Sequence, residues 1–139
     1  EILLIEDNDG DVRLAKEALK EVEVRTNLSV VNDGETALAF LHRENFYADA
    51  LRPDLILLDL NLPKKSGHEV LTEVKTDEDL MTIPIVVLSS SARDEDVLKA
   101  HDHFANCYVT KPSDIDAFWA VIKSIVEFWL IIVKIPAKR

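Results

Sequence analysis

Five short runs of Ile, Leu and Val recur along the chain and predict five buried strands. Each run is nearly continuous rather than alternating, as is typical of parallel strands that helices cover on both faces. The runs are Ile2–Ile5, Leu28–Val31, residues 54–59, Ile85–Ser89 and a last strand that ends near Val109 and Thr110.

Segments with helical periodicity separate these runs. Behind an acidic first residue, residues 11–22 place one apolar stripe on a helix, formed by Val12, Ala15, Ala18, Leu19 and Val22. Further helices are expected after the Asp33-Gly34 turn, over Gly67–Lys75, over residues 94–101 and behind Asp114, whereas residues 43–52 are expected to form a loop. The alternation predicts an α/β fold with a doubly wound, five-stranded parallel sheet and helices on both faces.

The last helix carries more apolar positions than one face requires. One stripe begins at Ile115 and should pack on the sheet; it continues through Phe118, Ile122, Ile125 and Trp129. A second stripe consists of Trp119, Val126, Leu130 and Val133, extended by Phe128, Ile131, Ile132 and Ile135. Lys123 and Glu127 interrupt the apolar stretch of this helix, which disfavours a membrane span. The second stripe instead predicts a two-fold homodimer through this helix and its adjoining strand and helix, with Trp119, Phe128 and Leu130 as contacts.

Polar residues stand where the predicted strands end. Glu6 and Asp7 follow the first strand, and Asp59 ends the third. In open α/β sheets the ligand site lies at the carboxyl ends of the strands, so these carboxylates should converge. Taken singly, each of them could simply cap a helix or begin a turn. Together they would repel one another unless a divalent ion or a lysine neutralised them, and Lys111 and Ser89 end two further strands.

In order and spacing, Glu6-Asp7, Asp59, Ser89 and Lys111-Pro112 resemble the receiver domain of bacterial two-component response regulators. Within that family, residues 52–67, 105–112 and 128–130 are similar to the small regulators that serve cyanobacterial and bacterial phytochromes. The resemblance spans essentially the whole chain and implies a flavodoxin-like fold. It implies a single receiver domain over residues 1–139, lacking a short N-terminal stretch and ending in a C-terminal extension over residues 131–139.

The chemistry of the residue types agrees with this resemblance. A carboxylate can attack phosphorus and form an acyl phosphate, which makes Asp59 the expected phospho-acceptor. Mg²⁺ prefers carboxylates, waters and phosphate oxygens, so Asp7 and Asp59 should ligate it directly and Glu6 through water; Mn²⁺ and Ca²⁺ are the expected substitutes. The resemblance implies a further ligand, the backbone carbonyl of Asn61. Lys111 should neutralise the phosphoryl group.

Two further expectations follow from the resemblance. Ser89 and Tyr108 are expected to form a switch pair, in which the hydroxyl closes on the phosphoryl group and the aromatic ring rotates inward. The alternative is a turn serine and a half-buried strand tyrosine. The resemblance also implies a cis peptide bond between Lys111 and Pro112.

Charge and composition restrict the partners. A formal net charge of −10 disfavours nucleic acid, and the segment after Lys111-Pro112 is too short for a helix-turn-helix output domain. A histidine kinase, of phytochrome type by resemblance, is the expected partner, with the signal leaving by protein contact. The one cysteine, Cys107, is expected to be a small core residue rather than a reactive thiol. No signal peptide is visible, and a cytoplasmic location is expected.

Two alternatives remain open. One is a small phosphatase of the haloacid-dehalogenase type, which would also use an aspartate nucleophile. Its second acid, two positions after the nucleophile, protonates the leaving group, and here that position holds Asn61, which cannot act as an acid. The other is a degenerate receiver that serves only as a scaffold, which the complete set of pocket acids disfavours.

Overall fold

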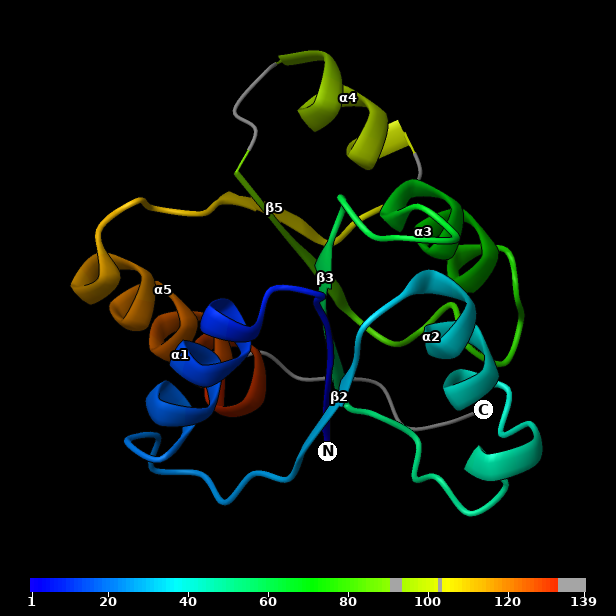
Figure 1. Cartoon of the computed structure of the whole chain (residues 1–139), viewed down its shortest axis with the longest axis horizontal. Coiled ribbons are helices and arrows are strands. Elements are labelled where there is room, and N and C mark those ends of the chain that lie inside the picture. Colours follow the sequence, from blue (N-terminus) through cyan, green and yellow to red (C-terminus); the bar gives the residue numbers. More distant parts are fainter. Residues whose placement is uncertain (91–93, 103, 133–139) are drawn as a thin grey trace.

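The protein is a three-layer α/β domain in the computed structural model, which describes residues 1–90, 94–102 and 104–132 (Figure 1). Five parallel strands form one sheet in the order β2-β1-β3-β4-β5. They are β1 (Ile2–Ile5), β2 (Leu28–Val31), β3 (Leu55–Asp59), β4 (Ile85–Ser89) and β5 (Cys107–Thr110). The predicted parallel sheet is confirmed.

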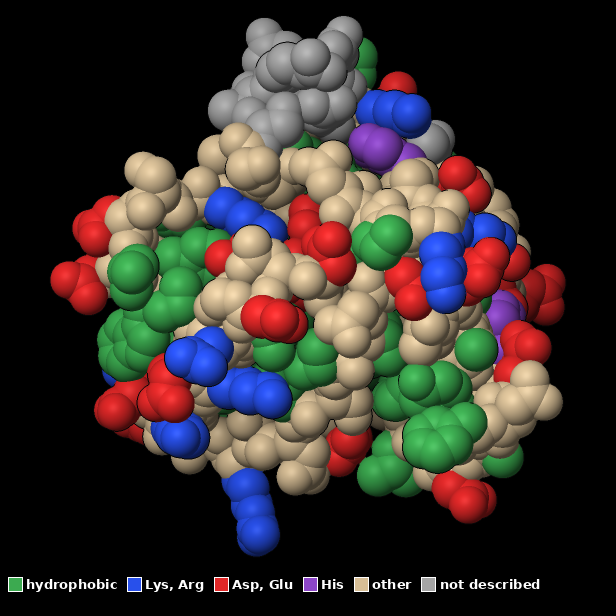
Figure 2. All heavy atoms as spheres, in the orientation of Figure 1, with side chains coloured by type: hydrophobic (Ala, Val, Ile, Leu, Met, Phe, Trp, Pro, Cys, Tyr) green, Lys and Arg blue, Asp and Glu red, His purple; other side chains and the backbone are tan. Residues whose placement is uncertain are grey.

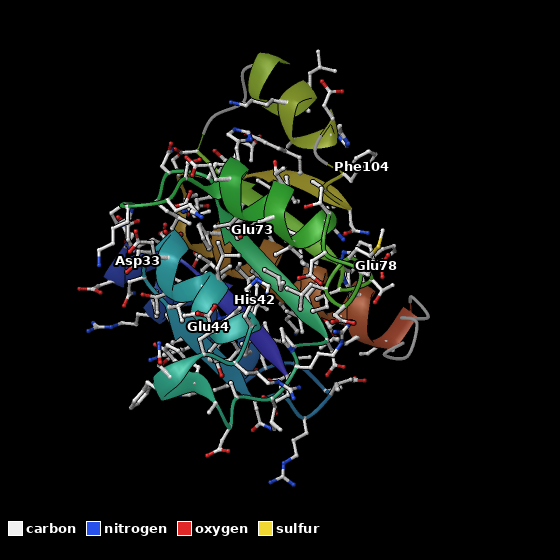
Figure 3. The ribbon with its side chains drawn as sticks, turned by 90° about the vertical axis from the view of Figure 1, so that its right-hand side faces the viewer. Asp33, His42, Glu44, Glu73, Glu78 and Phe104 are labelled. Carbon is white, nitrogen blue, oxygen red and sulfur yellow. The ribbon has the colours of Figure 1, made fainter. Side chains whose placement is uncertain are left out.

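Helices cover both faces of this sheet, as predicted. α1 (Asp9–Leu19) and α5 (Ile115–Glu127) pack together on one face. The other face carries α2 (Gly34–Leu41), α3 (Gly67–Lys75) and α4 (Asp94–Asp102), and Figure 3 shows α2 and α3 in front of the strands. The predicted loop over residues 43–52 contains a short 3₁₀ helix, Asn45–Tyr47.

Side-chain caps set where several helices begin. The side chain of Asn8 accepts a hydrogen bond from the backbone N–H of Asp11 at 2.9 Å, so α1 begins at Asp9. The prediction of residues 11–22 was therefore displaced at both ends, although Val22 still packs in the core. Asp33 caps α2 and Ser66 caps α3 in the same way, so both helices begin where the sequence predicted.

Alternate strand residues supply two separate cores. In β1 and β3 one set of side chains packs under α2 and α3, namely Leu3, Ile5, Ile56 and Leu58. The other set packs under α1 and α5, namely Ile2, Leu4, Leu55 and Leu57. All eight are buried, which explains why these strands read as continuous apolar runs.

The structure corrects part of the prediction for α5. Phe118, Ile122 and Ile125 are buried as expected, but Ile115 is 64% exposed. Val126, placed by the sequence on an outward stripe, is fully buried because α5 packs against α1 as well as against the sheet.

The rest of the second stripe is divided between core and surface. A π-helix, Phe128–Ile132, continues α5. Trp119 and Leu130 are half-buried against the core, as is Trp129 of the first stripe, whereas Phe128 and Ile131 are exposed. Val133 and Ile135, like most of the expected C-terminal extension, lie outside the described residues. Within the described part of the chain, no helix has the length and apolarity that a bilayer span requires.

The glycine that begins α3 fits closely against the end of β3. A Cβ atom on Gly67 would lie 2.5 Å from the carbonyl oxygen of Asp59 and 2.5 Å from the Cα of Leu60. Neither backbone atom can move without displacing the strand. We therefore expect Gly67→Ala to lower the free energy of unfolding by about 1–3 kcal/mol, measured by urea denaturation.

Gly10 offers the matched control, because it also lies in the first turn of a helix. A Cβ atom there would approach only the side-chain oxygen of Asn8, at 3.2 Å. Gly10→Ala should be neutral or stabilising, since alanine favours the helix by up to about 1 kcal/mol. Equal losses for the two variants would contradict the argument from close packing.

Candidate functional site

The predicted acidic residues meet at the carboxyl edge of the sheet. β1 and β3 are neighbours in register, so Glu6 and Asp7, which follow β1, lie beside Asp59, the last residue of β3. One carboxylate oxygen from each of the three lies within 4.8 Å of the others. Glu6 and Asp59 are buried and Asp7 is exposed. Figure 2 shows acidic side chains at the surface above these strand ends.

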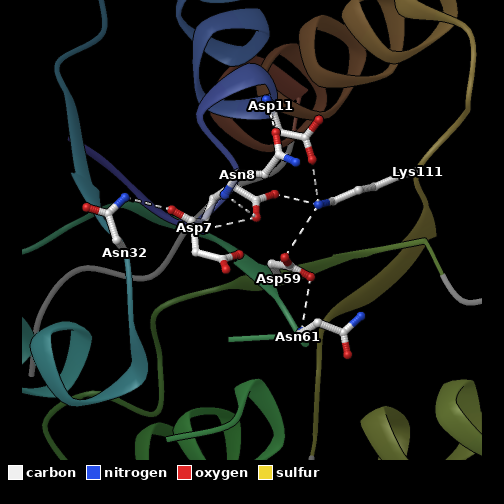
Figure 4. Close-up of polar contacts among 8 residues, drawn as sticks. Asp7, Asn8, Asp11, Asn32, Asp59, Asn61 and Lys111 are labelled. Atoms are coloured by element: carbon white, nitrogen blue, oxygen red, sulfur yellow. Dashed lines mark hydrogen bonds and ion pairs between the residues drawn. The ribbon is translucent and has the colours of Figure 1, made fainter. Parts of the chain in front are cut away.

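Lys111, just beyond β5, reaches into this acid cluster (Figure 4). Its ammonium group donates a hydrogen bond to Oε1 of Glu6 and lies 3.5 Å from Oδ2 of Asp59. It also donates to Oδ2 of Asp11 at 2.9 Å. The predicted neutralising lysine therefore lies among the predicted acids.

Sequence reasoning missed three polar residues of this site. Asp11 had no expected role beyond opening a helix, yet it pairs with Lys111. Asn8 caps α1. Asn32 donates a side-chain N–H to the backbone carbonyl of Glu6 at 2.9 Å, which holds the backbone of Glu6 in place. The available signal was the run of acids and amides between Glu6 and Asp11, which is denser than one helix cap requires.

The electrostatic balance of the site is strongly negative. Burial raises the pKa of Glu6 to about 8, and the neighbouring Asp59 adds to this rise. Burial alone would lower the pKa of Lys111, but its hydrogen bonds to Glu6 and Asp11 raise that pKa above the ordinary lysine value, so the ammonium is retained. One ammonium group thus faces the carboxyl groups of four acids, Glu6, Asp7, Asp11 and Asp59, and the site stays net negative even when Glu6 is protonated.

These residues fit a hard divalent cation. The cluster of Glu6, Asp7 and Asp59 offers only oxygen ligands, which such ions prefer, and Lys111 compensates only part of its negative charge. Asn61 lies next to the cluster, since its backbone N–H donates to Oδ1 of Asp59 at 3.2 Å. The backbone of this predicted ligand is therefore close to the carboxylates.

The two residues of the expected switch pair lie on neighbouring strands. Ser89 ends β4, is 1% exposed, and stands one position beyond Leu88, which pairs with Asp59 across the sheet. Its carbonyl accepts a hydrogen bond from the backbone N–H of Lys111 at 2.7 Å. Tyr108 is half-buried in β5 and packs against the core on the α2 and α3 side.

The prediction of a cis bond before Pro112 was wrong. The described residues contain no cis peptide bond, so the bond between Lys111 and Pro112 is trans. The trans isomer is the lower-energy form of every peptide bond, and a following proline reduces the energy difference between trans and cis without reversing it. Lys111 reaches Glu6 and Asp59 from this trans backbone.

The fold and the acid site define a class of protein. A parallel sheet in this strand order, with paired acids after β1, an aspartate ending β3 and a lysine after β5, is the arrangement of a receiver domain. The chain belongs to the response regulator receiver domain family, which matches residues 2–123.

Particular relatives narrow the class further. Response regulator Rcp1 from Synechocystis sp. (strain ATCC 27184 / PCC 6803 / Kazusa) is 44% identical over 136 residues, which cover 98% of this chain and 92% of that protein. The crystal structure of the phosphorylated cyanobacterial phytochrome response regulator RcpA superposes with a TM-score of 0.95 at 48% identity, covering 98% of this chain and 97% of that one. The Mn²⁺-bound form of Rcp1 superposes with a TM-score of 0.94 at 44% identity, covering 98% of each chain.

Proposed function

We propose that Asp59 accepts a phosphoryl group from a partner histidine kinase in a Mg²⁺-dependent reaction, and that the phosphorylated chain changes its protein contacts. The observation that carries this proposal is the position of the Asp59 carboxylate, which lies beside the acid pair after β1 and 3.5 Å from the ammonium group of Lys111. The similarity to RcpA, whose structure is of a phosphorylated protein, supports it.

The transfer is a displacement at phosphorus. A carboxylate oxygen of Asp59 forms a bond to phosphorus while the P–N bond of the kinase phosphohistidine breaks. The electron pair of that bond stays on the imidazole nitrogen, which takes up a proton from solvent. Lys111 lies 3.5 Å from Asp59 and neutralises part of the charge on the transferred group.

Mg²⁺ is the cation expected at this site. Asp7 and Asp59 would hold it directly, Glu6 through water and Asn61 through its backbone carbonyl. When bound, it supplies the positive charge that brings the carboxylate and the phosphoryl group together. The Mn²⁺-bound form of Rcp1 supports a divalent ion here.

The direct test is an intact mass measurement after incubation with Mg²⁺ and acetyl phosphate. A single phosphoryl adduct that hydroxylamine removes is expected, since hydroxylamine cleaves acyl phosphates. The alternative, a phosphatase, would release inorganic phosphate from added phosphate esters. Absence of the adduct with both acetyl phosphate and a phosphorylated kinase would refute the proposed function.

The partner kinase is proposed to be of phytochrome type, acting on this chain in the cytoplasm. The similarity to the phytochrome regulator RcpA supports this choice. Transfer from an autophosphorylated phytochrome kinase should be at least about tenfold faster than transfer from an unrelated histidine kinase, because cognate pairs present complementary surfaces. Equal rates from both kinases would exclude a dedicated phytochrome partner.

Lys111 is proposed to link phosphorylation to the change in contacts, together with Ser89 and Tyr108. Lys111→Ala should still accept phosphoryl groups, but more slowly, because Asp59 and the metal ligands remain. The switch should fail, because no ammonium group draws the phosphoryl oxygens into place.

Amide chemical shifts at Ser89 and Tyr108, recorded with and without phosphorylation, measure this switch. Large shift changes are expected in the wild type and small ones in Lys111→Ala. Lys64→Ala is the matched control, because Lys64 follows β3 at the same edge and its side chain is 61% exposed. A normal switch in Lys111→Ala would remove the lysine from the proposed mechanism.

We further propose a homodimer through α5, the adjoining strand β5 and helix α4. Phe128 and Ile131 are each 48% exposed, and a pocket of about 580 Å³ lies beside Phe128, lined also by Cys107, Ile125 and Trp129. Exposed aromatic and aliphatic side chains around such a hollow favour a protein contact. Trp119 and Leu130 contribute their remaining exposed edges, and Lys123 covers one face of the Trp119 ring at 5.6 Å.

Light scattering at micromolar concentration tests the dimer. The wild type should be dimeric, and Phe128→Ala should weaken association by about 2 kcal/mol or more, roughly thirtyfold in the dissociation constant. Phe46→Ala is the matched control, because Phe46 is 90% exposed but lies on the side of α2. A monomeric wild type would contradict this interface.

A further inference from the structure

Asp11 holds the lysine of the site from the side opposite Asp59. Its Oδ2 atom lies 2.9 Å from the ammonium nitrogen of Lys111, closer than Oδ2 of Asp59 at 3.5 Å. Figure 4 shows Lys111 reaching between these two carboxylates, one from α1 and one from β3. The strongest contacts of the lysine are therefore with Glu6 and Asp11, not with the proposed phospho-acceptor.

The local structure fixes the position of Asp11. It lies in the first turn of α1, where its backbone N–H donates to the capping side chain of Asn8 at 2.9 Å. The side chain of Asp11 is 25% exposed, and that of Lys111 is only 11% exposed. An ion pair that is partly removed from water and built on a capped helix is more strongly held than one on a flexible surface.

We propose that Asp11 is a positioning residue that competes with the phosphoryl group for Lys111. This inference rests on the proposed phosphoryl transfer to Asp59. Before transfer, Asp11 holds the ammonium group toward α1, so that it lies 3.5 Å from Asp59 rather than in closer contact, and Asp59 stays available to a divalent cation. After transfer, Lys111 must move from Asp11 toward the phosphoryl oxygens.

The competition follows from charge. A phosphoryl group adds about −1.5 to −2 charges and strong acceptor oxygens, which draw a nearby ammonium group. The Asp11 carboxylate resists this movement and also repels the anionic phosphoryl donor. Removing the carboxylate therefore favours transfer, but it lets Lys111 approach Asp59 and compete with the cation there.

Asp11→Asn should therefore change two measured quantities in opposite directions. The rate of phosphorylation by acetyl phosphate at saturating Mg²⁺ should rise, and the affinity for Mg²⁺, measured by calorimetry, should fall. We expect each change to be roughly threefold or more, as for groups in direct contact. A variant that merely damaged the fold of the site would lower both quantities.

Two variants serve as controls. Asp9→Asn removes the same charge from the same helical turn, and Asp9 is exposed to solvent. It should alter both quantities much less. Asp11→Glu keeps the charge and should restore most of the wild-type behaviour. The inference is overturned if Asp11→Asn behaves like Asp9→Asn, or if phosphorylation at saturating Mg²⁺ slows.

A double-mutant cycle shows whether the effect passes through the lysine. In a Lys111→Met background, Asp11→Asn should lower Mg²⁺ affinity no more than Asp9→Asn does, because the competing ammonium group is gone. An undiminished effect would overturn the inference. If the wild type takes up no phosphoryl group at all, the proposed function fails, whereas this Mg²⁺ cycle still measures the control of Lys111 by Asp11.

Discussion

Asp59→Asn is expected to carry no phosphoryl group after incubation with acetyl phosphate and Mg²⁺, whereas the wild type acquires one. The amide has the shape of the carboxylate but lacks the anionic oxygen that attacks phosphorus. No neighbouring acid should substitute, because Glu6 is held in a buried hydrogen bond with Lys111 and Asp7 follows a different strand. Intact mass and peptide mapping measure the result.

Asp54→Asn provides the matched control. Asp54 directly precedes β3, at the opposite end from Asp59, where its side chain is 61% exposed. This variant should be phosphorylated like the wild type. A persistent wild-type level of adduct in Asp59→Asn would disprove the assignment of the acceptor.

Thermal unfolding gives an independent measure of the same variant. Asp59 lies among carboxylates that one lysine only partly neutralises, so its neutral replacement should raise the free energy of unfolding by about 1 kcal/mol without Mg²⁺. Added Mg²⁺ should then stabilise the wild type but not Asp59→Asn, because only the folded wild type offers the complete site. A destabilised Asp59→Asn would mean that its loss of phosphorylation reflects damage to the fold.

The acid site could be predicted from sequence because parallel strands end at one edge of a sheet. If the runs before Glu6 and Asp59 are strands of one parallel sheet, their carboxylates should converge at one edge, and they do. The same argument placed Ser89, which ends β4, and Lys111, which follows the edge strand β5. Residues at strand ends can be placed from the sequence because the hydrogen-bonded backbone of the sheet fixes their positions.

Asp11 could not be assigned in this way. An acidic residue in the first turn of a helix is sufficiently explained by the helix dipole, so its type and position indicate nothing more. Its second role depends on contact with a lysine 100 residues later in the chain. The two meet only in the folded chain, where Lys111, just beyond β5, reaches the first turn of α1.

The errors in α5 and at Pro112 have different origins. A helix that packs on one surface buries one stripe of side chains. The prediction that Val126 faces outward assumed that α5 packs on the sheet alone. α5 instead contacts both the sheet and α1, so its buried arc is wider. At Pro112 the sequence permits either isomer, and the surrounding structure decides between them.

Asp7→Asn is expected to lose Mg²⁺-dependent phosphorylation while keeping its fold. Asp7 is the exposed member of the acid cluster, so a neutral side chain there leaves no buried group without a partner. Its side chain is one of the two carboxylates proposed to hold the cation directly, and Mg²⁺ sites depend on one or two carboxylates. We expect the affinity for Mg²⁺ to fall at least about tenfold, which corresponds to roughly 1.4 kcal/mol.

Calorimetry with Mg²⁺ and the acetyl phosphate reaction measure this effect together. At a low Mg²⁺ concentration Asp7→Asn should remain unlabelled, and a large excess of Mg²⁺ should restore part of the labelling, because the nucleophile Asp59 is intact. Asp9→Asn again controls for charge at the same edge, since Asp9 lies two positions further on and is exposed. An unchanged Mg²⁺ titration in Asp7→Asn would show that the cation is held by Asp59 and Glu6 without Asp7, and the site would have to be assigned anew around those two buried carboxylates.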